Sequence, residues 1–419
     1  MKFTRRGLVA AAVATPSLAR AADAAPAAPA APSTALPARS AFAKMPYVYL
    51  DSGSTHPMPL GAKAALEEYL RFKARDGEWR GYSMGAKETA VIENFGALVG
   101  ASPDELCLVQ STTMGENLVL KALGFPQGGG RIVTDALHFF GSFYTYGELA
   151  RAGVEVVTVP MEPDGRIDTA RLVAAIDDKT RLVAVSHVST VNGFEHDLTR
   201  IAEAAHAHGA YLYADIVHGA GSTPLDLRAA GVDFAATSSY KWLMGDFGLA
   251  FLYARREVQP KVERPWWGYH QVGGRFVTHL YPFDPPGEAP AEYGYADGAN
   301  GLFAMGTTSW TGVVQLDHTL PWIRAIGLDR MQAHRQPLAD AVQAELRRRG
   351  YQPLTPHRSR TPLVAFALKD ARRKLGPALE KAQVRMTVSG NRFRVSLSVF
   401  NDMNDVDRLL EALPKTPPA

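Results

Sequence analysis

Short apolar runs alternate with amphipathic stretches along most of the chain, from about Ala62 onward. Runs such as RIVTDAL and RLVAVSHV have the length and the branched side chains typical of buried strands. Between them, stretches such as DLTRIAEAAHAHG place apolar residues at helical spacing. This alternation predicts crossover units, and therefore a mostly parallel sheet with helices on both faces. Ligands bind such sheets at the carboxyl ends of the strands, so the residues after each strand are the first candidates for a site.

Two later segments depart from this alternation. Residues 261–290 are rich in proline and aromatic residues. Because long connections are usually functional covers or disordered, the aromatic residues favour an ordered cover. After the motif MGTTSW, two helical stretches precede mixed strands and a final helix, which predicts a smaller α+β domain. We therefore expect four parts: a signal peptide and Ala/Pro linker (1–40), an N-terminal segment (41–61), a large domain (62–300) and a C-terminal small domain with a linking helix (301–413).

The N-terminal leader differs in composition from the rest of the chain. Arg5 and Arg6 precede a short Gly/Ala/Val/Leu segment and an Ala-rich stretch, which is the layout of a secretory signal. This start resembles a twin-arginine signal, which implies export of the folded protein to the periplasm by the Tat machinery. The alternative is a disordered basic tail without an address. The apolar run is too short to span a bilayer, so we expect no membrane anchor.

Bulk composition narrows the classes of partner. Hydrophobic residues make up 46% of the chain and charged residues 21%, which is typical of a soluble globular protein. The net charge is +3 and no basic block occurs, which argues against a nucleic-acid partner. Cys107 is the only cysteine, so no intrachain disulfide can form. It lies in the strand-like run ELCLVQS, where a thiol is usually a small core residue.

Three strand ends bear polar residues suited to chemistry. Ser111, Thr112 and Thr113 precede a helix, where hydroxyls and free amides suit a phosphate or act only as caps. Asp215 ends a buried strand, so its carboxylate needs a metal, an ion-pair partner or a protonated heterocyclic nitrogen. His218 follows, but no third ligand stands at tight spacing, so we expect no metal site. Lys241, in SSYKWLMGDFG, is either a snorkelling surface residue or a desolvated amine kept for chemistry.

Together these motifs resemble a known family. The Asp-x-x-His pair, GVDFAATSSYKWL, a glycine-bearing turn and the strand LAFLY are similar to the class V aminotransferase family of fold-type I pyridoxal phosphate enzymes. That family includes cysteine desulfurases, kynureninases and isopenicillin N epimerases. The likeness extends from Tyr47 to Leu413. It implies an α/β fold, with a mostly parallel sheet of the seven-stranded type in the large domain and a smaller α+β C-terminal domain.

The resemblance assigns cofactor-binding roles to the strand-end residues. Lys241 would hold pyridoxal 5′-phosphate covalently and shuttle protons, and Asp215 would pair with the protonated ring nitrogen. His218 would lie near the ring hydroxyl. Phe139 would stack on the ring, with His138 as the alternative after a one-residue shift. The residues implied at the phosphate are Thr112, Thr113, Ser238 and Tyr240.

The resemblance also implies a substrate site and a partner. Arg394 would grip the substrate α-carboxylate through its planar fork, with Arg392 as the alternative. The N-terminal segment would place Ser54, Thr55 or His56 beside the substrate. Thr307, in MGTTSW, would reach the phosphate of a neighbouring subunit's cofactor, which implies a homodimer with shared active sites.

Departures from the family pattern limit the choice of reaction. Desulfurases need a mobile catalytic cysteine, and Cys107 lies in a predicted strand, so desulfuration by that route is not expected. Thr190 stands where an Asn near the ring hydroxyl is usual, with Asn192 close by. Asp246 replaces a common Pro, a change for which the sequence offers no interpretation.

We therefore expect a pyridoxal phosphate enzyme acting at the α-carbon of an amino substrate, most simply an exported aminotransferase. C–S lysis and epimerisation share its first steps. The alternative of another class is a periplasmic binding protein without turnover.

Overall fold

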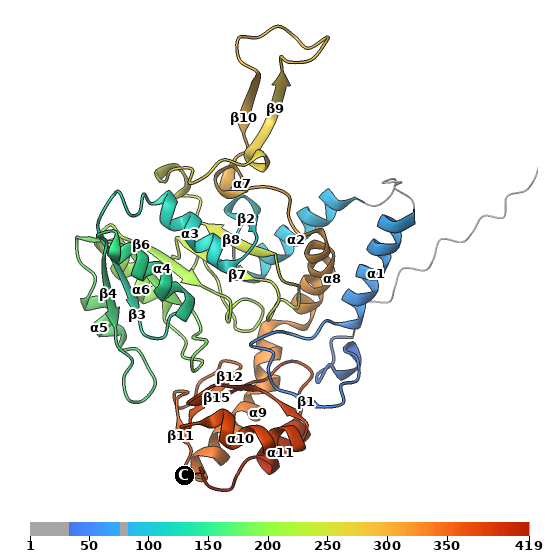
Figure 1. Ribbon diagram of the computed structural model, residues 1–419, viewed down its shortest axis with the longest axis vertical. Coiled ribbons are helices and arrows are strands. Elements are labelled where there is room, and N and C mark those ends of the chain that lie inside the picture. The colour runs from blue at the N-terminus through green and yellow to red at the C-terminus, as the bar shows by residue number, and fades with distance from the viewer. Residues whose placement is uncertain (1–32, 76–82, 419) are drawn as a thin grey trace, which may run out of the picture. The chain divides into compact units, whose positions relative to one another are not determined.

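The computed structural model describes residues 33–75 and 83–418. Its central sheet has seven strands in the order β2-β8-β7-β6-β5-β3-β4 (Figure 1). Only β8 runs antiparallel to its neighbours, so the sheet is mostly parallel, as predicted. The strands are β2 (Leu106–Val109), β3 (Arg131–Asp135), β4 (Glu155–Val159), β5 (Thr180–Ser186), β6 (Tyr211–Asp215), β7 (Phe234–Ser238) and β8 (Ala250–Ala254).

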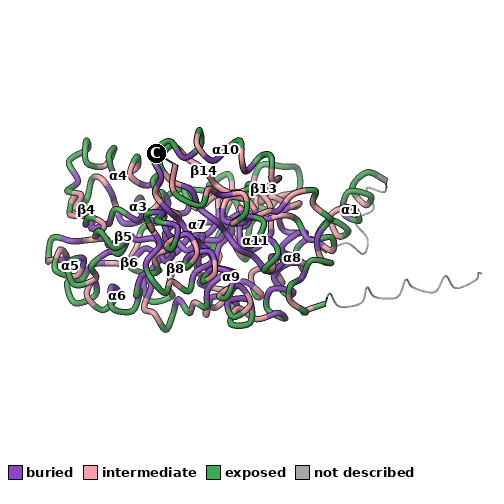
Figure 2. Tube along the Cα trace, turned by 90° about the horizontal axis from the view of Figure 1, so that it is seen from below, coloured by how far each residue is buried: buried purple, intermediate pink, exposed green. Residues whose placement is uncertain are grey.

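The central strands of the sheet are buried on both faces because apolar residues occupy successive positions along them. In β5, Val183 and Val185 belong to one buried cluster, whereas Leu182 and Ala184 belong to a second cluster on the opposite face. Figure 2 shows buried residues gathered in the interior and exposed residues along the outer helices. The helices of this part are α1 (Leu60–Arg75), α2 (Met84–Val99), α3 (Thr112–Ala122), α4 (Phe140–Arg151), α5 (Thr169–Ala174), α6 (Leu198–Ala207), α7 (Gly298–Phe303) and α8 (Trp310–Ile326).

The C-terminal part forms the predicted smaller α+β unit. Its antiparallel sheet has the order β11-β12-β15-β14 and packs with three helices around its own apolar cluster. Strand β1 (Val48–Tyr49) pairs with β13 (Val384–Arg385), so the N-terminal segment joins this unit. The remaining elements are α9 (Leu328–Arg348), β11 (Gln352–Pro353), β12 (Leu363–Ala367), α10 (Ala371–Lys381), β14 (Thr387–Val388), β15 (Arg392–Ser396) and α11 (Met403–Ala412).

The proline- and aromatic-rich segment contains a hairpin, β9 (Val272–Thr278) and β10 (Ala291–Tyr295), which projects from the rest of the described chain (Figure 1). The segment contains regular structure, as predicted from its aromatic residues. Its large side chains are exposed, as at Phe276, Tyr281 and Phe283. A covering role over a site stays a prediction.

The predicted Ala/Pro linker ends earlier than expected. Trp322 donates its indole N–H to the Ser33 carbonyl at 3.0 Å, and the Ala38 amide donates to Val399 at 2.8 Å. Arg39 forms an ion pair with Asp402 at 2.9 Å. The linker prediction is therefore wrong for residues 33–40, because their backbone and side chains find fixed partners. The predicted signal lies outside the described residues, and no helix within them is both long and apolar enough to cross a membrane.

Candidate active site

A cavity of about 140 Å³ lies at the carboxyl ends of the central strands. It is formed where β2, β5, β6 and β7 end, at the edge where parallel sheets bind ligands. Ten residues predicted from the sequence share this one cavity. The complete lining is Ser111, Thr112, Thr113, Phe139, Ser186, Thr190, Asp215, Val217, His218, Ser238, Tyr240 and Lys241.

Lys241 lies in the turn that follows β7, and its side chain faces the cavity rather than bulk solvent. Only 9% of the residue is exposed, and its Nζ lies 3.1 Å from Nε2 of His218. Burial lowers the pKa of this amine to about 8, although the charge of Asp215 acts in the opposite direction. The surface alternative is therefore wrong, because the amine is buried, and its use for chemistry stays a prediction.

Asp215 ends β6 and is almost fully buried beside Lys241. Its Oδ1 accepts the Val217 amide at 2.9 Å, and among residues 33–75 and 83–418 no cation lies within ion-pair distance of it. Burial consequently raises the pKa of this carboxyl, and the charge of His138 only partly offsets that effect. The same described residues contain no cluster of metal ligands. An underpaired buried carboxylate facing a cavity fits the protonated nitrogen of a heterocycle.

The start of α3 forms the anion-binding end of the cavity. Ser111 caps the helix by accepting the Met114 amide at 3.1 Å, so capping and ligand binding occur at one place. The Thr112 hydroxyl lies 2.8 Å from the Ser238 hydroxyl across the cavity wall. Free backbone amides at a helix N-terminus together with these hydroxyls suit a phosphate group. Tyr240 stacks on Phe247 with 4.4 Å between ring centroids.

Phe139, not His138, lies in the cavity wall. His138 is fully buried behind it, with Nδ1 2.9 Å from the Ser186 hydroxyl and Nε2 3.6 Å from Glu116. Glu116 also accepts the Tyr146 hydroxyl at 2.5 Å. Burial opposes ionisation of both partners, but their mutual attraction raises the pKa of His138 and lowers that of Glu116. His138 therefore belongs to a paired network behind the wall, so the placement favours Phe139 as the stacking residue.

Arg394 projects from β15 and reaches the cavity lining through Thr190. One Nη atom donates to the Thr190 hydroxyl at 2.9 Å, and the other donates to Ser54 and Thr387 at 3.0 Å. Asp51 lies 3.7 Å away. Burial lowers the pKa of Arg394 to about 10. Its Nε is buried without a partner among the described residues.

Arg392, the alternative grip, lies on the same strand and reaches the same loop as Arg394, but it bonds only to backbone carbonyls there. Its Nη1 donates to the Val191 carbonyl at 2.5 Å, so it fastens the loop that contains Thr190. This placement favours Arg394 over Arg392 as the substrate-facing arginine.

Like His138 and Arg394, three further predicted residues lie outside the lining of this cavity. His56 is buried with Nε2 2.6 Å from Ser398, and burial lowers its pKa to about 4. The Thr55 carbonyl accepts the Tyr49 hydroxyl at 2.6 Å. Thr307 is exposed and its hydroxyl lies 3.0 Å from that of Tyr269. The predicted roles of Thr55 and His56 as direct substrate contacts gain no support from this arrangement.

Sequence reasoning missed Ser186 and Val217 in the lining and Thr387 beside Arg394. Ser186 pairs in register with Asp215, so its position at the end of β5 was an available signal. Thr387 lies on the short strand β14, which pairs with β15. No local sequence pattern predicts this pairing.

The two departures near the cofactor residues also have structural explanations. Asp246 accepts the Phe247 amide at 2.8 Å and the Gln315 amide at 3.2 Å, so it fixes the turn after Lys241 to helix α8. Asn192 donates to the Gly165 carbonyl at 2.6 Å and lies outside the lining, whereas Thr190 lies within it.

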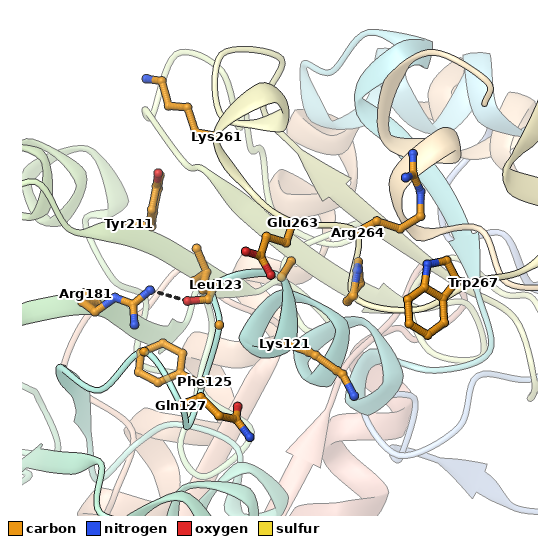
Figure 3. A pocket seen from close by; sticks show the side chains of 14 residues that line it. Lys121, Leu123, Phe125, Gln127, Arg181, Tyr211, Lys261, Glu263, Arg264 and Trp267 are labelled. Atoms are coloured by element: carbon orange, nitrogen blue, oxygen red, sulfur yellow. Dashed lines mark hydrogen bonds between the residues drawn. The ribbon is translucent and has the colours of Figure 1, made fainter. Parts of the chain in front are cut away.

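A second, larger cavity of about 730 Å³ lies at the amino ends of the strands, near the starts of β5 and β6 (Figure 3). Arg181 is engaged by the Leu123 and Gly129 carbonyls. Figure 3 shows the amino groups of Lys121 and Lys261 pointing in different directions. The charged groups of this cavity therefore do not converge on one point.

Comparisons with known proteins agree with this geometry. The model of the family described as aminotransferase class-V matches residues 48–409. A probable cysteine desulfurase of Methanothermobacter thermautotrophicus is 30% identical over 304 residues, which cover 71% of this chain and 72% of the relative. A cysteine desulfurase of Shigella sonnei is 26% identical over 393 residues, which cover 88% and 93%.

Solved structures show the same fold. The cysteine desulfurase CsdA from Escherichia coli superposes with a TM-score of 0.77 at 22% identity, covering 90% of this chain and 97% of that one. The cystine C–S lyase C-DES, in complex with cysteine persulfide, gives a TM-score of 0.74 at 19% identity, covering 87% and 97%. A C-DES mutant has glycine covalently linked to its PLP cofactor. Family and fold together identify pyridoxal phosphate as the cofactor of an enzyme, and the chain belongs to the aminotransferase class-V family.

Proposed function

We propose that this pyridoxal phosphate enzyme acts at the α-carbon of an amino-group substrate and is an aminotransferase. The observation that supports this most directly is the pairing of a desolvated amine with an underpaired carboxylate in one cavity. Lys241 has a pKa lowered to about 8 by burial, and Asp215 has no ion-pair cation in the described chain. Both groups face the hydroxyl-rich start of α3, so one small cavity offers sites for an aldehyde, a ring nitrogen and a phosphate.

Pyridoxal phosphate would supply an electron sink for the bonding electrons of the substrate α-carbon. Lys241 would bind the cofactor and, once displaced, its neutral amine would take the α-proton and return it at another position. The Asp215 carboxylate would hold the ring nitrogen protonated. Thr112, Ser238 and the first amides of α3 would hold the phosphate.

The substrate carboxylate would bind Arg394. Its guanidinium is already turned toward the Thr190 hydroxyl at the cavity wall, at 2.9 Å. The hydroxyls of Ser54 and Thr387 are neutral partners that an anionic carboxylate can replace with a stronger, charge-assisted pair.

The cysteine content favours transamination over cysteine desulfuration, despite the names of the relatives. Cys107, the only cysteine, is 0% exposed in β2 and its thiol points to the Leu108 carbonyl at 3.4 Å. Burial raises its pKa, so the reactive thiolate is suppressed. C–S lysis without a cysteine nucleophile, and epimerisation, remain the alternatives because both begin with loss of the same α-proton.

We also propose a homodimer and export. Thr307 is exposed and lies outside its own chain's cavity, which supports its reaching a partner's phosphate. The Arg5-Arg6 leader supports periplasmic delivery by the Tat machinery. Light scattering tests the dimer, and periplasmic fractionation with Arg5 and Arg6 replaced by Lys tests the route. A monomer that retains full activity, or cytoplasmic retention of the unaltered chain, would contradict these proposals.

The function is tested first by absorbance of the purified protein. We expect a band near the visible edge that Lys241→Ala removes and that the exposed control Lys261→Ala retains. Lys241→Ala should lower turnover by at least about 10³-fold, because it removes the proton-transferring amine. A panel of amino donors and keto acids then separates the reactions through keto-acid, pyruvate and racemisation assays. A colourless protein that binds amino acids without turnover would overturn the proposal in favour of the binding-protein alternative.

A further inference from the structure

A short relay of hydrogen bonds lies beside Lys241. The indole Nε1 of Trp242 donates to Nδ1 of His218 at 3.1 Å, and Nε2 of His218 lies 3.1 Å from Nζ of Lys241. Trp242 is 2% exposed and His218 is 3% exposed, so water does not compete for these contacts. Trp242 immediately follows Lys241, and one turn therefore supplies both ends of the relay.

The chemistry of the indole fixes the direction of the relay. An indole N–H can only donate, so Nδ1 of His218 must accept and has to be unprotonated. A neutral imidazole with its lone pair on Nδ1 has its proton on Nε2. That N–H then points at the Lys241 amine, which accepts it with a lone pair in its neutral form, the form that prevails above a pKa of about 8. A doubly protonated His218 would instead place one N–H against the N–H of Trp242.

The charges around His218 act in the same direction. Burial lowers its pKa, and the cationic groups of Lys241, from the β7–β8 turn, and Arg394, from β15, lower it further. His218 is thus a neutral imidazole whose only remaining freedom is the choice of tautomer. Trp242 removes that freedom.

We propose that Trp242 is a positioning residue that fixes the Nε2–H tautomer of His218 when the Lys241 amine is neutral, so that His218 then donates a hydrogen bond toward Lys241 and the cavity. The next step rests on the proposed function. Once Lys241 binds the cofactor and no longer accepts from His218, this N–H would be available to an oxygen of the cofactor. His218 would then act through a fixed N–H and would not itself exchange protons with substrate. The indole beside the lysine would have a polar task in addition to its packing.

The test is direct observation of the imidazole nitrogens. The full chain labelled with ring-¹⁵N histidine is studied by long-range ¹H–¹⁵N NMR, and His218→Gln assigns the signal. We expect Nδ1 of His218 to be unprotonated and Nε2 to bear the proton at pH 9, where the Lys241 amine is neutral, and we expect no second proton on the ring between pH 5.5 and 9. A protonated Nδ1 of His218 at pH 9, or a doubly protonated His218 above pH 5.5, in the unaltered chain would overturn the proposal.

Trp242→Phe keeps an aromatic ring and removes only the donor. We expect the tautomer ratio of His218 to shift toward Nδ1–H by about fivefold, the ratio that one net hydrogen bond provides. The matched control is Trp322→Phe, which removes an equally buried indole N–H bonded to the Ser33 carbonyl at 3.0 Å. It should leave the His218 signals unchanged. An unchanged ratio in Trp242→Phe would assign Trp242 to packing alone.

The outcome is separable from that of the proposed function. The tautomer is read from nitrogen signals whether or not cofactor is bound, whereas the function is read from the visible band and turnover. A locked tautomer in a colourless protein would leave the relay intact and defeat only the proposed function. A coloured, active enzyme with a free tautomer would do the reverse.

Discussion

The two cavities at opposite edges of the central sheet differ in a way that volume does not reveal. The one at the amino ends measures about 730 Å³ and the one at the carboxyl ends about 140 Å³. In the larger cavity, Arg181 is held by backbone carbonyls and the two lysines point apart. In the smaller one, Lys241 and Asp215 are both buried, close to each other and short of partners.

The difference teaches that convergence of underpaired polar groups, and not size, marks the site. Burying a charged group without a partner costs stability, so such a group persists where a ligand completes it. The network of Glu116 and His138 behind the cavity wall gives a second comparison, between a buried carboxylate that has partners and one that lacks them. Glu116 and Asp215 are both buried. Glu116 accepts hydrogen bonds from Tyr146 and Ser142, so it needs no ligand and stabilises the fold.

After Lys241→Ala, the largest expected effect comes from neutralising the underpaired carboxylate. Asp215→Asn should lower turnover by about 10² to 10³-fold, the range for loss of one pre-organised charge. The same change should raise the melting temperature of the cofactor-free chain at neutral pH. Because folding raises the pKa of Asp215, the native state binds more protons than the unfolded state, and stability falls as pH rises through that interval. Asn removes this cost.

The matched control lies in the larger cavity. Glu263 is exposed and contributes its backbone amide to the Ala122 carbonyl at 3.1 Å, a bond that Glu263→Gln preserves. Both turnover and melting temperature should stay unchanged. Equal losses of activity in the two variants, or a fall in melting temperature for Asp215→Asn, would break the comparison.

Much of this arrangement follows from local sequence. The strands near Asp215 and Lys241 are continuous apolar runs, so their type and order along the chain were predictable, and parallel pairing then brings their ends to one edge. The Ser111 cap likewise has a local signature. Strand pattern, parallel pairing and helix capping together predict the position of the cavity and most of the residues that line it.

What could not be predicted depends on contacts between distant segments. A one-residue shift decides whether Phe139 or His138 faces the cavity, and the deciding factor is the bond from His138 to Ser186, 48 residues away. The packing of residues 33–40 depends on Trp322 and Asp402, which lie far along the chain. The bond from the Trp242 indole to His218 likewise forms only in the folded turn, so the local sequence does not predict it.

A smaller effect is expected in the pH dependence of cofactor capture. Only the neutral amine of Lys241 reacts with an aldehyde, so the rate of pyridoxal phosphate incorporation, trapped by borohydride, should rise about tenfold per pH unit and level off near pH 8. Since folding lowers this pKa, the unfolded state binds more protons above pH 8, and stability of the cofactor-free chain should rise across that interval. Asp215→Asn should move the inflection to lower pH, because the carboxylate favours the charged amine. An inflection near that of an ordinary lysine, with no shift in the variant, would mean that the amine is solvated.

The smallest effect should follow from removing the only thiol. Cys107 faces an apolar cluster on the sheet face opposite α2 and takes no part in the cavity lining. Cys107→Ala should lower the free energy of unfolding by about 1 kcal/mol, the scale of one buried methylene, and leave turnover within about twofold. Cys107→Ser buries a hydroxyl and should cost more stability at the same turnover. If either variant lost activity while keeping its fold and its visible band, a thiol would belong to the mechanism, and the reaction would move toward the desulfurases that the relatives are named for.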